Sequence, residues 1–358
     1  MLICSDSLEF AAEILQQDVA GRLCSEAGPG MTVGPVARAL SAPGAVLYTG
    51  AVPDASWTFM LLTAQSKQSQ CDRLLELARD GHEIPDRIVC LARTGPRFHG
   101  FKGRTWSAAP GNIHLAVHFA PDCVIERFEV AFTMLAALSV VDALDELPVL
   151  AGRSGIRWVN DIVVDDAKVG GVLAYTQTRD RTVTSAILGI GLNVEVTPAI
   201  LPTPFVPAVS SVCELAADGV SVTQRAMLEL LLNALQRNYG LLLQVGYRPL
   251  LERYRQRSTI IGQECTVCTD ESDAELETIA TGRVIAIGDG LELHLEGVQK
   301  PVTRGRLFVS RPRAPARTAG YGASPMPGRA NPRSNGADPR AERAERQDHR
   351  GASHDADT

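Results

Sequence analysis

The sequence contains no apolar run of the roughly 18 residues that a membrane-spanning helix requires. Its first residues also lack the basic start and the apolar core of a secretory signal peptide. These absences lead us to expect a cytoplasmic protein with no membrane partner. The 358 residues, of which 45% are hydrophobic, leave room for two or three domains with a sizeable core.

Cysteine is too scarce for a disulfide-stabilised scaffold, because only eight cysteines are scattered along the chain. The one close pair is Cys265 and Cys268, and no second pair follows to complete a four-thiolate zinc site. The pair lies in an alternating, strand-like segment, where residues three apart point to opposite faces. We therefore expect a structural role for these thiols.

Basic residues are nearly absent from residues 1–60, which carry Arg22 and Arg38 against six acidic side chains. The formal net charge of the whole chain is −6. Because binding to DNA phosphates needs clustered Lys and Arg, a DNA-binding head is excluded at this end. Residues 1–60 are expected to be an N-terminal extension of another kind.

Residues 311–358 contain no Leu, Ile, Val, Phe or Trp. A segment of this composition cannot bury enough apolar surface to offset the entropy lost on ordering. The sequence therefore predicts a disordered tail.

Hydrophobic periodicity predicts a mixture of helices and strands between residues 61 and 257, and thus an α+β domain. Helices are expected at 8–15, 72–79, 128–147, 223–245 and 249–257, and strands at 112–119, 162–164, 171–175 and 186–190. Residues 258–310 have the pattern of short strands, with a tight turn at Gly288–Gly290. This second region is expected to form a small β-barrel-like module.

Three polar segments follow one another in the predicted α+β domain. The central one is Arg157-Trp-Val-Asn-Asp161, followed by Lys168-Val-Gly-Gly171. Its amide and carboxylate oxygens suit Mg²⁺, its cations suit phosphate and carboxylate, and its glycines allow a ligand close to the backbone. Gly100–Trp106 lies upstream and Gly189–Val194 downstream. Together the segments indicate ATP-dependent activation of a carboxylic acid.

The same segments resemble, in order and spacing, the motifs of the biotin–protein ligase family, within the wider biotin/lipoyl ligase superfamily. They are Gly103-Arg-Thr-Trp106, Pro110-Gly-Asn-Ile113, Arg157–Asp161, Lys168–Gly171 and Gly189-Ile-Gly-Leu-Asn193. The resemblance covers about residues 60–310. It implies a catalytic domain of the class II synthetase type at 61–257, with a mixed sheet and helices, and an SH3-like barrel at 258–310.

The resemblance also implies a two-step reaction that uses ATP and Mg²⁺. Biotin would be adenylated to biotinyl-5′-AMP with release of pyrophosphate. A lysine of a biotin carboxyl carrier protein domain would then attack the acyl carbon and displace AMP. Adenylation turns a poor acyl donor into a good one, and the enzyme aligns the reactants and neutralises phosphate charge.

By the same resemblance, particular residues receive roles. Lys168 and Arg104 would be catalytic. The substrate would contact Ser69, Gln70, His99, Gly100, Phe101, Lys102, Gly103, Trp106, Gly170 and Gly171. The nucleotide would contact Arg157, Trp158, Asn160, Asp161 and Asn193, and Mg²⁺ would bind through Asn160 and Asp161.

The chain departs from the family pattern where the acid is expected to bind. The family's Arg-rich loop here has Gly95 for its Gln, and Phe98, His99 and Phe101 for a Gly and two Arg. The family's Ser-Thr-Asn is Ser69-Gln70-Cys71. These changes leave two alternatives to a biotin ligase open. One is ligation of lipoate or another short carboxylic acid, and the other is a non-catalytic homologue that binds nucleotide or carrier domain.

Overall fold

The protein was studied as a computed structural model, which describes residues 1–16, 20–21, 23–25, 35–41, 45–52, 56–216, 220–269 and 276–309. The predicted tail at 311–358 lies outside the described residues. Met1–Pro312 form one compact unit. The domain boundaries predicted after residues 60 and 257 lie inside this unit and stay predictions, and the first of them falls within a strand. Among the described residues, no helix is both long enough and apolar enough to cross a membrane.

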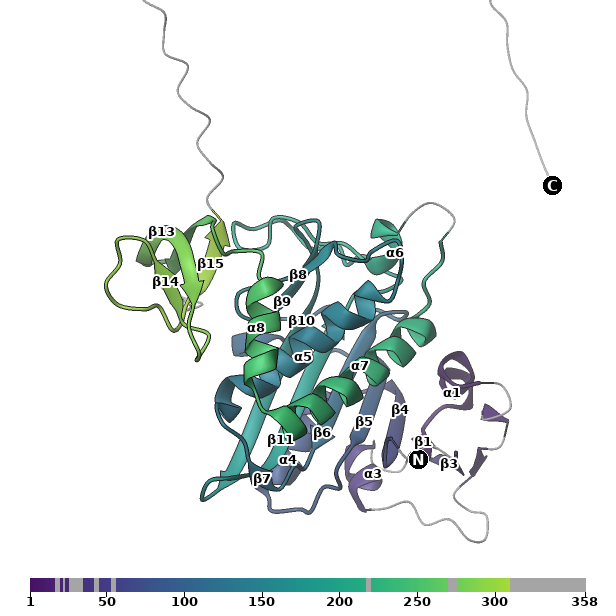
Figure 1. Cartoon of the computed structure of the whole chain (residues 1–358). Helices are drawn as coiled ribbons and strands as arrows, with labels where there is room; N and C mark the ends of the chain where they lie inside the picture. Colours follow the sequence, from purple (N-terminus) through teal and green to yellow (C-terminus); the bar gives the residue numbers. More distant parts are fainter. Residues whose placement is uncertain are drawn as a thin grey trace, which may run out of the picture. The chain divides into compact units, whose positions relative to one another are not determined.

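A mixed sheet of eleven strands carries the fold (Figure 1). Its order is β2-β3-β1-β4-β5-β6-β11-β10-β9-β8, and β7 also pairs with β11. The pairs β1–β4 and β4–β5 are parallel, and the other described pairs of this sheet are antiparallel. The strands are β1 (Leu2–Ser5), β2 (Cys24–Ser25), β3 (Tyr48–Ala51), β4 (Phe59–Gln65), β5 (Ile88–Thr94), β6 (Ile113–Phe119), β7 (Cys123–Val124), β8 (Ser154–Arg157), β9 (Asp161–Val164), β10 (Ala167–Arg179) and β11 (Thr182–Leu192).

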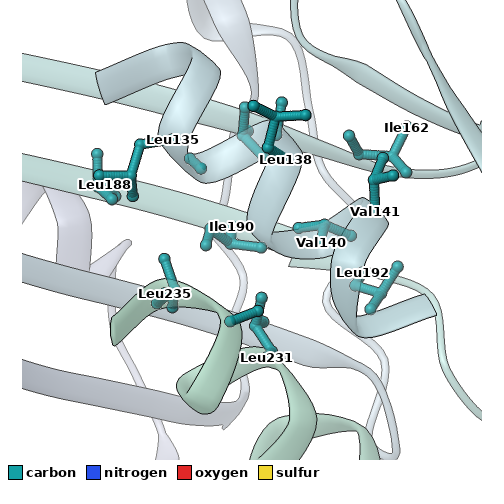
Figure 2. Packing of buried hydrophobic residues seen from close by; sticks show 14 of the residues in the cluster. Leu135, Leu138, Val140, Val141, Ile162, Leu188, Ile190, Leu192, Leu231 and Leu235 are labelled. Atoms are coloured by element: carbon teal, nitrogen blue, oxygen red, sulfur yellow. The ribbon is translucent and has the colours of Figure 1, made fainter. Parts of the chain in front are cut away.

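Helices cover both faces of this sheet. Successive strand residues point to opposite sides, so each strand contributes side chains to both layers of helices. Leu188 and Ile190 of β11 belong to a core cluster with α5 (Phe128–Asp145), α7 (Gln224–Val245) and α8 (Arg248–Gln256). Ile187, which precedes Leu188 and points to the opposite face, belongs to a second cluster with α4 (Gln70–Arg79) and α3 (Pro35–Leu40). Figure 2 shows part of the first cluster, with Leu188, Ile190, Leu192, Leu135, Leu138, Val141, Leu231 and Leu235 packed together.

The helices begin and end where short-range sequence signals place them. The Ser7 side chain accepts a hydrogen bond from Phe10 N and caps α1 (Leu8–Ile14), and Thr223 caps α7 in the same way. Gly81, with φ +80°, follows α4, and Gly246, with φ +97°, ends α7. The five helices expected from the sequence are thus confirmed, with ends shifted by one or two residues.

The sheet is more extensive than the sequence predicts. Strands β1, β3, β4, β5 and β8 carry no period-two pattern that marks them in the sequence, and β4, β5 and β8 are buried along most of their length. The strand expected at 112–119 is confirmed as β6, and all seven of its residues are buried.

A second sheet of four antiparallel strands follows the main sheet along the chain. Its order is β14-β13-β12-β15, from β12 (Glu264–Cys268), β13 (Thr278–Ile287), β14 (Leu293–Leu295) and β15 (Arg306–Val309). The predicted turn at Gly288–Gly290 lies between β13 and β14, and the Glu292 carboxylate accepts a hydrogen bond from Gly290 N. Cys265 and Cys268 both lie in β12 with buried side chains.

Candidate functional site

The strand register brings the separate polar segments into one row across the main sheet. Gly171 of β10 lies opposite Asp161 of β9 on one side and opposite Gly191 of β11 on the other. Gly191 in turn lies opposite His114 of β6. Neighbouring strands are about 4.8 Å apart, so residues distant in sequence line a single surface. The loop of residues 98–106 and the start of α4 border this row.

Gly191 has no room for a side chain, because the indole ring of Trp106 packs directly against its Cα. A Cβ at Gly191 would be 2.5 Å from Trp106 Cζ2. The Trp106 indole N–H donates to His114 Nδ1 at 3.2 Å, and the Ala109 carbonyl accepts from His114 Nε2 at 3.0 Å. His114 is therefore the neutral Nε2–H tautomer, and burial lowers its pKa to about 4. This arrangement holds the indole ring of Trp106 in place beside the row.

A first cavity, with about 740 Å³ of empty space, lies between α4, the loop and the row. Gln70 lines it and is almost fully buried, with Nε2 donating to Thr63 Oγ1 at 2.8 Å and no described partner for Oε1. Apolar groups make up much of the wall, among them Phe98, Leu115, Ala116, Val172, Leu173 and Ile190.

A second cavity, with about 1110 Å³ of empty space, adjoins the first. It is lined by Arg157, Trp158, Asn193, the segment 198–209 and part of β15. Seven residues line both cavities: Phe101, Arg104, Thr105, Trp106, Asn160, Asp161 and Lys168. A ligand that extends from one cavity to the other would therefore pass these shared residues.

Lys168 and Asp161 form an ion pair on this shared wall. Lys168 Nζ lies 2.6 Å from Asp161 Oδ1, and each side chain is 20% exposed. The pairing of β9 with β10 shifts register between Lys168 and Gly170, and such a bulge re-aims the side chains beside it. Asn160 is held by its Nδ2, which donates to the Val172 carbonyl at 2.6 Å. One ammonium, one carboxylate and one amide thus lie together on the shared wall.

Two buried polar side chains of the second cavity have an atom without a described partner. Arg157 is 6% exposed, and its Nη2 donates to the Asp166 carbonyl at 3.0 Å while Nη1 has no partner. Asn193 is 1% exposed, and its Nδ2 donates to the Ser210 carbonyl at 3.1 Å while Oδ1 has no partner. Leaving such a group unsatisfied costs about 1–3 kcal/mol. One donor and one acceptor beside the second cavity therefore have no described partner.

The loop before Trp106 is a closed turn. Gly100 N donates to the Arg104 carbonyl at 2.7 Å, and His99 bridges to Thr105. Both ring nitrogens of His99 are engaged, with the Gly100 carbonyl at 3.1 Å and with the Asp72 carboxylate at 2.8 Å. The pKa of His99 is raised above its ordinary value: the Gly100 carbonyl raises it most, burial opposes this, and the Asp72 carboxylate adds to the rise.

Most residues assigned from the sequence meet around the two cavities, and three do not. Lys102 lines a third hollow together with Glu129 and Arg304, and this hollow shares Phe101 and Asn160 with the two cavities. Gly103 is exposed at the tip of the loop, with φ +73°. Gly170 faces the neighbouring strand, since a Cβ there would be 2.7 Å from the Gly191 carbonyl oxygen.

Sequence reasoning missed one whole wall of the second cavity, the segment 198–209. Four prolines interrupt this segment, which has neither helical nor strand periodicity. The backbone of Lys168 holds it, because Lys168 N donates to the Ala208 carbonyl and Ser210 N donates to the Lys168 carbonyl. Apolar residues among the prolines, such as Leu201 and Phe205, were the only sequence signal that this segment packs against the rest of the domain. In the structure the Arg306 guanidinium lies 3.9 Å from the centre of the Phe205 ring.

Comparisons with known proteins bear on the same part of the chain. The model of the biotin/lipoate A/B protein ligase family matches residues 64–193. A bifunctional ligase/repressor from Bacillus subtilis is 25% identical over 185 residues, which are 50% of this chain and 55% of that protein. A biotin–[acetyl-CoA-carboxylase] ligase from Mycobacterium tuberculosis is 29% identical over 217 residues, 59% of this chain and 75% of that protein. The match thus spans about half the length of the Bacillus protein.

A solved structure shares the fold. The biotin protein ligase from Aquifex aeolicus in complex with biotin and ATP superposes with a TM-score of 0.54 and 18% identity. The superposition covers 70% of this chain and 98% of that one. The predicted mixed sheet with helices is thereby confirmed as the architecture of this kind of domain.

Proposed function

We propose that the chain is an ATP-dependent biotin–protein ligase, because the model of the biotin/lipoate A/B protein ligase family matches residues 64–193. The observation that carries this proposal is the pair of adjoining cavities with Lys168, Asp161 and Arg104 on their common wall. The acid occupies the first cavity and ATP the second, so that the carboxylate and the α-phosphate meet at that wall. The relatives named for biotin and the Aquifex complex with biotin and ATP support the choice of ligands.

In the first step a carboxylate oxygen of biotin attacks the α-phosphorus. A new O–P bond forms, the bond to the β-phosphate oxygen breaks, and pyrophosphate leaves. The Lys168 ammonium lies where negative charge gathers on the attacking carboxylate and the phosphate, and Arg104 adds a second cation. Fixed cations on a partly buried wall stabilise that charge better than water does.

In the second step the amine of an acceptor lysine attacks the acyl carbon. The carbon–nitrogen bond forms, the acyl carbon–oxygen bond breaks, the nitrogen loses a proton and AMP leaves. We assign the acceptor to a biotin carboxyl carrier protein domain. We also assign the four-stranded sheet at 258–310 to an SH3-like module that borders the nucleotide cavity, where Arg306 and Leu307 line the wall.

The nucleotide cavity offers groups of the right kind for ATP. The free Nη1 of Arg157 is a donor for a phosphate oxygen, and the free Oδ1 of Asn193 is an acceptor for a base amine or a ribose hydroxyl. Trp158 presents its ring to the same cavity. The Asp161 carboxylate and the Asn160 amide are oxygen ligands that suit Mg²⁺, which proteins hold through one or two carboxylates together with substrate phosphates. Bound there, Mg²⁺ would neutralise phosphate charge.

The test is acid-dependent exchange of radiolabelled pyrophosphate into ATP by the full chain, with biotin, lipoate, octanoate and no acid in parallel. We expect exchange with biotin and its loss when EDTA removes the metal. Exchange with lipoate or octanoate alone would assign the chain to another acid. A folded protein that binds ATP but exchanges with none of these acids would overturn the ligase proposal.

A further inference from the structure

One side-chain contact joins two walls of the first cavity that are distant in sequence. His99 Nε2 lies 2.8 Å from Asp72 Oδ2 and 3.0 Å from Asp72 Oδ1. Asp72 is the third residue of α4, whose first turn also presents Gln70 and Cys71 to the cavity. His99 opens the loop that carries Phe101 and Arg104 to the opposite wall.

The contact restrains the whole loop, because the loop is closed on itself. Gly100 N bonds to the Arg104 carbonyl, and His99 bridges to Thr105. Trp106 N donates to the Phe98 carbonyl at 2.9 Å, so the loop is also tied at its base. A displacement of His99 away from α4 would therefore carry Arg104 with it.

Both ring nitrogens of His99 face groups that can only accept a hydrogen bond. Nδ1 lies 3.1 Å from the Gly100 carbonyl oxygen, and Nε2 faces the Asp72 carboxylate. A neutral imidazole has one N–H and can satisfy only one of them, whereas the imidazolium donates to both. The contact is therefore complete only when His99 carries its positive charge.

We propose that Asp72 is a positioning residue, which holds the loop of residues 99–105 against α4 through His99 and so keeps the first cavity closed over an acyl-adenylate. The role rests on the proposed ligase function. Asp72 touches neither the adenylate nor the reacting atoms in this account. Its effect is on how long the reactive intermediate stays bound, since the loop must move away from α4 for that intermediate to escape.

Other titratable and charged groups lie around this contact. Burial raises the pKa of Cys71 on α4 and of Tyr175 on β10, and burial lowers the pKa of His114 on β6 to about 4. Across the cavity, Asp161 and Lys168 are paired with each other. Arg79 on α4 and the loop's Lys102 and Arg104 complete the charged groups nearby.

The experiment measures release of preformed acyl-adenylate from the full chain between pH 6 and 8.5, with labelled adenylate chased by excess unlabelled biotin and ATP. In the Asp72→Ala variant we expect release about fivefold faster at pH 6, with little change in the rate of the first turnover. Wild-type release should accelerate as the pH rises through the pKa of His99. His99→Arg, which stays charged, should remove that acceleration. Asp80→Ala, a carboxylate at the far end of α4, is the matched control and should release adenylate at the wild-type rate.

A second readout needs no catalysis. The imidazole C2 proton of His99, assigned by its disappearance in His99→Arg, should titrate above the ordinary value of about 6.5 in the wild type and lower in Asp72→Asn. The role of Asp72 would be overturned if Asp72→Ala catalyses pyrophosphate exchange and releases the adenylate at the wild-type rate. It would also be overturned if the pKa of His99 is the same in Asp72→Asn as in the wild type. Absence of acid-dependent exchange in the wild type would overturn the ligase function itself, and the adenylate role with it.

Discussion

The side chain of Lys168 must be held in place and must also remain accessible to a ligand. Its ammonium must stay charged and available at a wall shared by two cavities, and it must be fixed without being buried beyond the reach of a ligand. The ion pair with Asp161 at 2.6 Å fixes it, and an exposure of 20% leaves it accessible. Its backbone meanwhile holds the segment 198–209 through hydrogen bonds on both sides. The side chain can therefore be removed while those backbone bonds stay.

Substitution of Lys168 separates its chemical role from its structural role. In Lys168→Ala we expect pyrophosphate exchange to fall by about 100- to 1000-fold, the usual effect of losing one group that stabilises transition-state charge. The melting temperature, followed by circular dichroism, should change little, because a partly exposed ion pair contributes about 1 kcal/mol or less. Lys300→Ala, at an exposed position in the connection between β14 and β15, is the control. Exchange at the wild-type rate in Lys168→Ala would remove this residue from the reaction.

At the scale of elements, the packing of β10 and β11 depends on two glycines that have no room for a side chain. The Gly191 position is occupied by the Trp106 ring, and the Gly170 position on β10 is occupied by the Gly191 carbonyl. These close approaches let β10, β11 and the loop before β6 pack at the mouth of the cavities. A residue that fills either space must move backbone or a buried indole.

Gly191→Ala tests this packing directly. The added Cβ would lie 2.5 Å from the Trp106 ring, so the indole must move and its hydrogen bond to His114 must break. We expect a loss of about 1–3 kcal/mol in the free energy of unfolding, measured by urea denaturation, together with weaker ATP binding. Gly240→Ala on α7 is the matched control: no atom lies within 4 Å of its Cβ position, and it should stabilise by about 0.5–1 kcal/mol. Equal stability of Gly191→Ala and the wild type would contradict the packing argument.

For the whole molecule, two buried histidines make stability depend on acid pH. Burial lowers the pKa of His114 to about 4 and lowers that of His118 as well, both on the fully buried strand β6. Because the unfolded chain binds a proton at about pH 6.5 and the folded one does not, stability is fully present above that pH and is lost as the pH falls toward 4. His99 has the opposite sign: its raised pKa adds stability below about pH 6.5 that is lost as the pH rises through its folded value.

The acid dependence can be assigned to His114 by substitution. Between pH 6.5 and 4, the two-and-a-half-unit shift corresponds to about 3 kcal/mol of unfolding free energy at most. His114→Asn keeps an acceptor near the Trp106 N–H and removes the titration, so its stability should fall less steeply with acid, although it should be lower at pH 7. Urea unfolding at several pH values measures both slopes. Parallel slopes for the two proteins would mean that another group dominates.

Local physics explains what the sequence alone determined. Helix ends at Ser7, Gly81, Thr223 and Gly246 follow from capping and from glycine's freedom at positive φ, which involve neighbours a few residues away. The order of the polar segments around Asn160, Lys168 and Gly191 is also a property of the chain, and it was sufficient to indicate ATP and a carboxylic acid.

Tertiary structure decided what depends on partners far along the chain. The row Asp161–Gly171–Gly191–His114 exists because non-local strand pairing sets the register, and a shift of one residue would turn each side chain to the other face. The side chains of Asp72 and His99 are in contact although 27 positions separate them in the sequence. The segment 198–209 forms a cavity wall because it is hydrogen-bonded to the Lys168 backbone. The strands that are buried along most of their length had no alternating pattern to mark them. Burial then shifted the pKa of His114, which no local pattern contains.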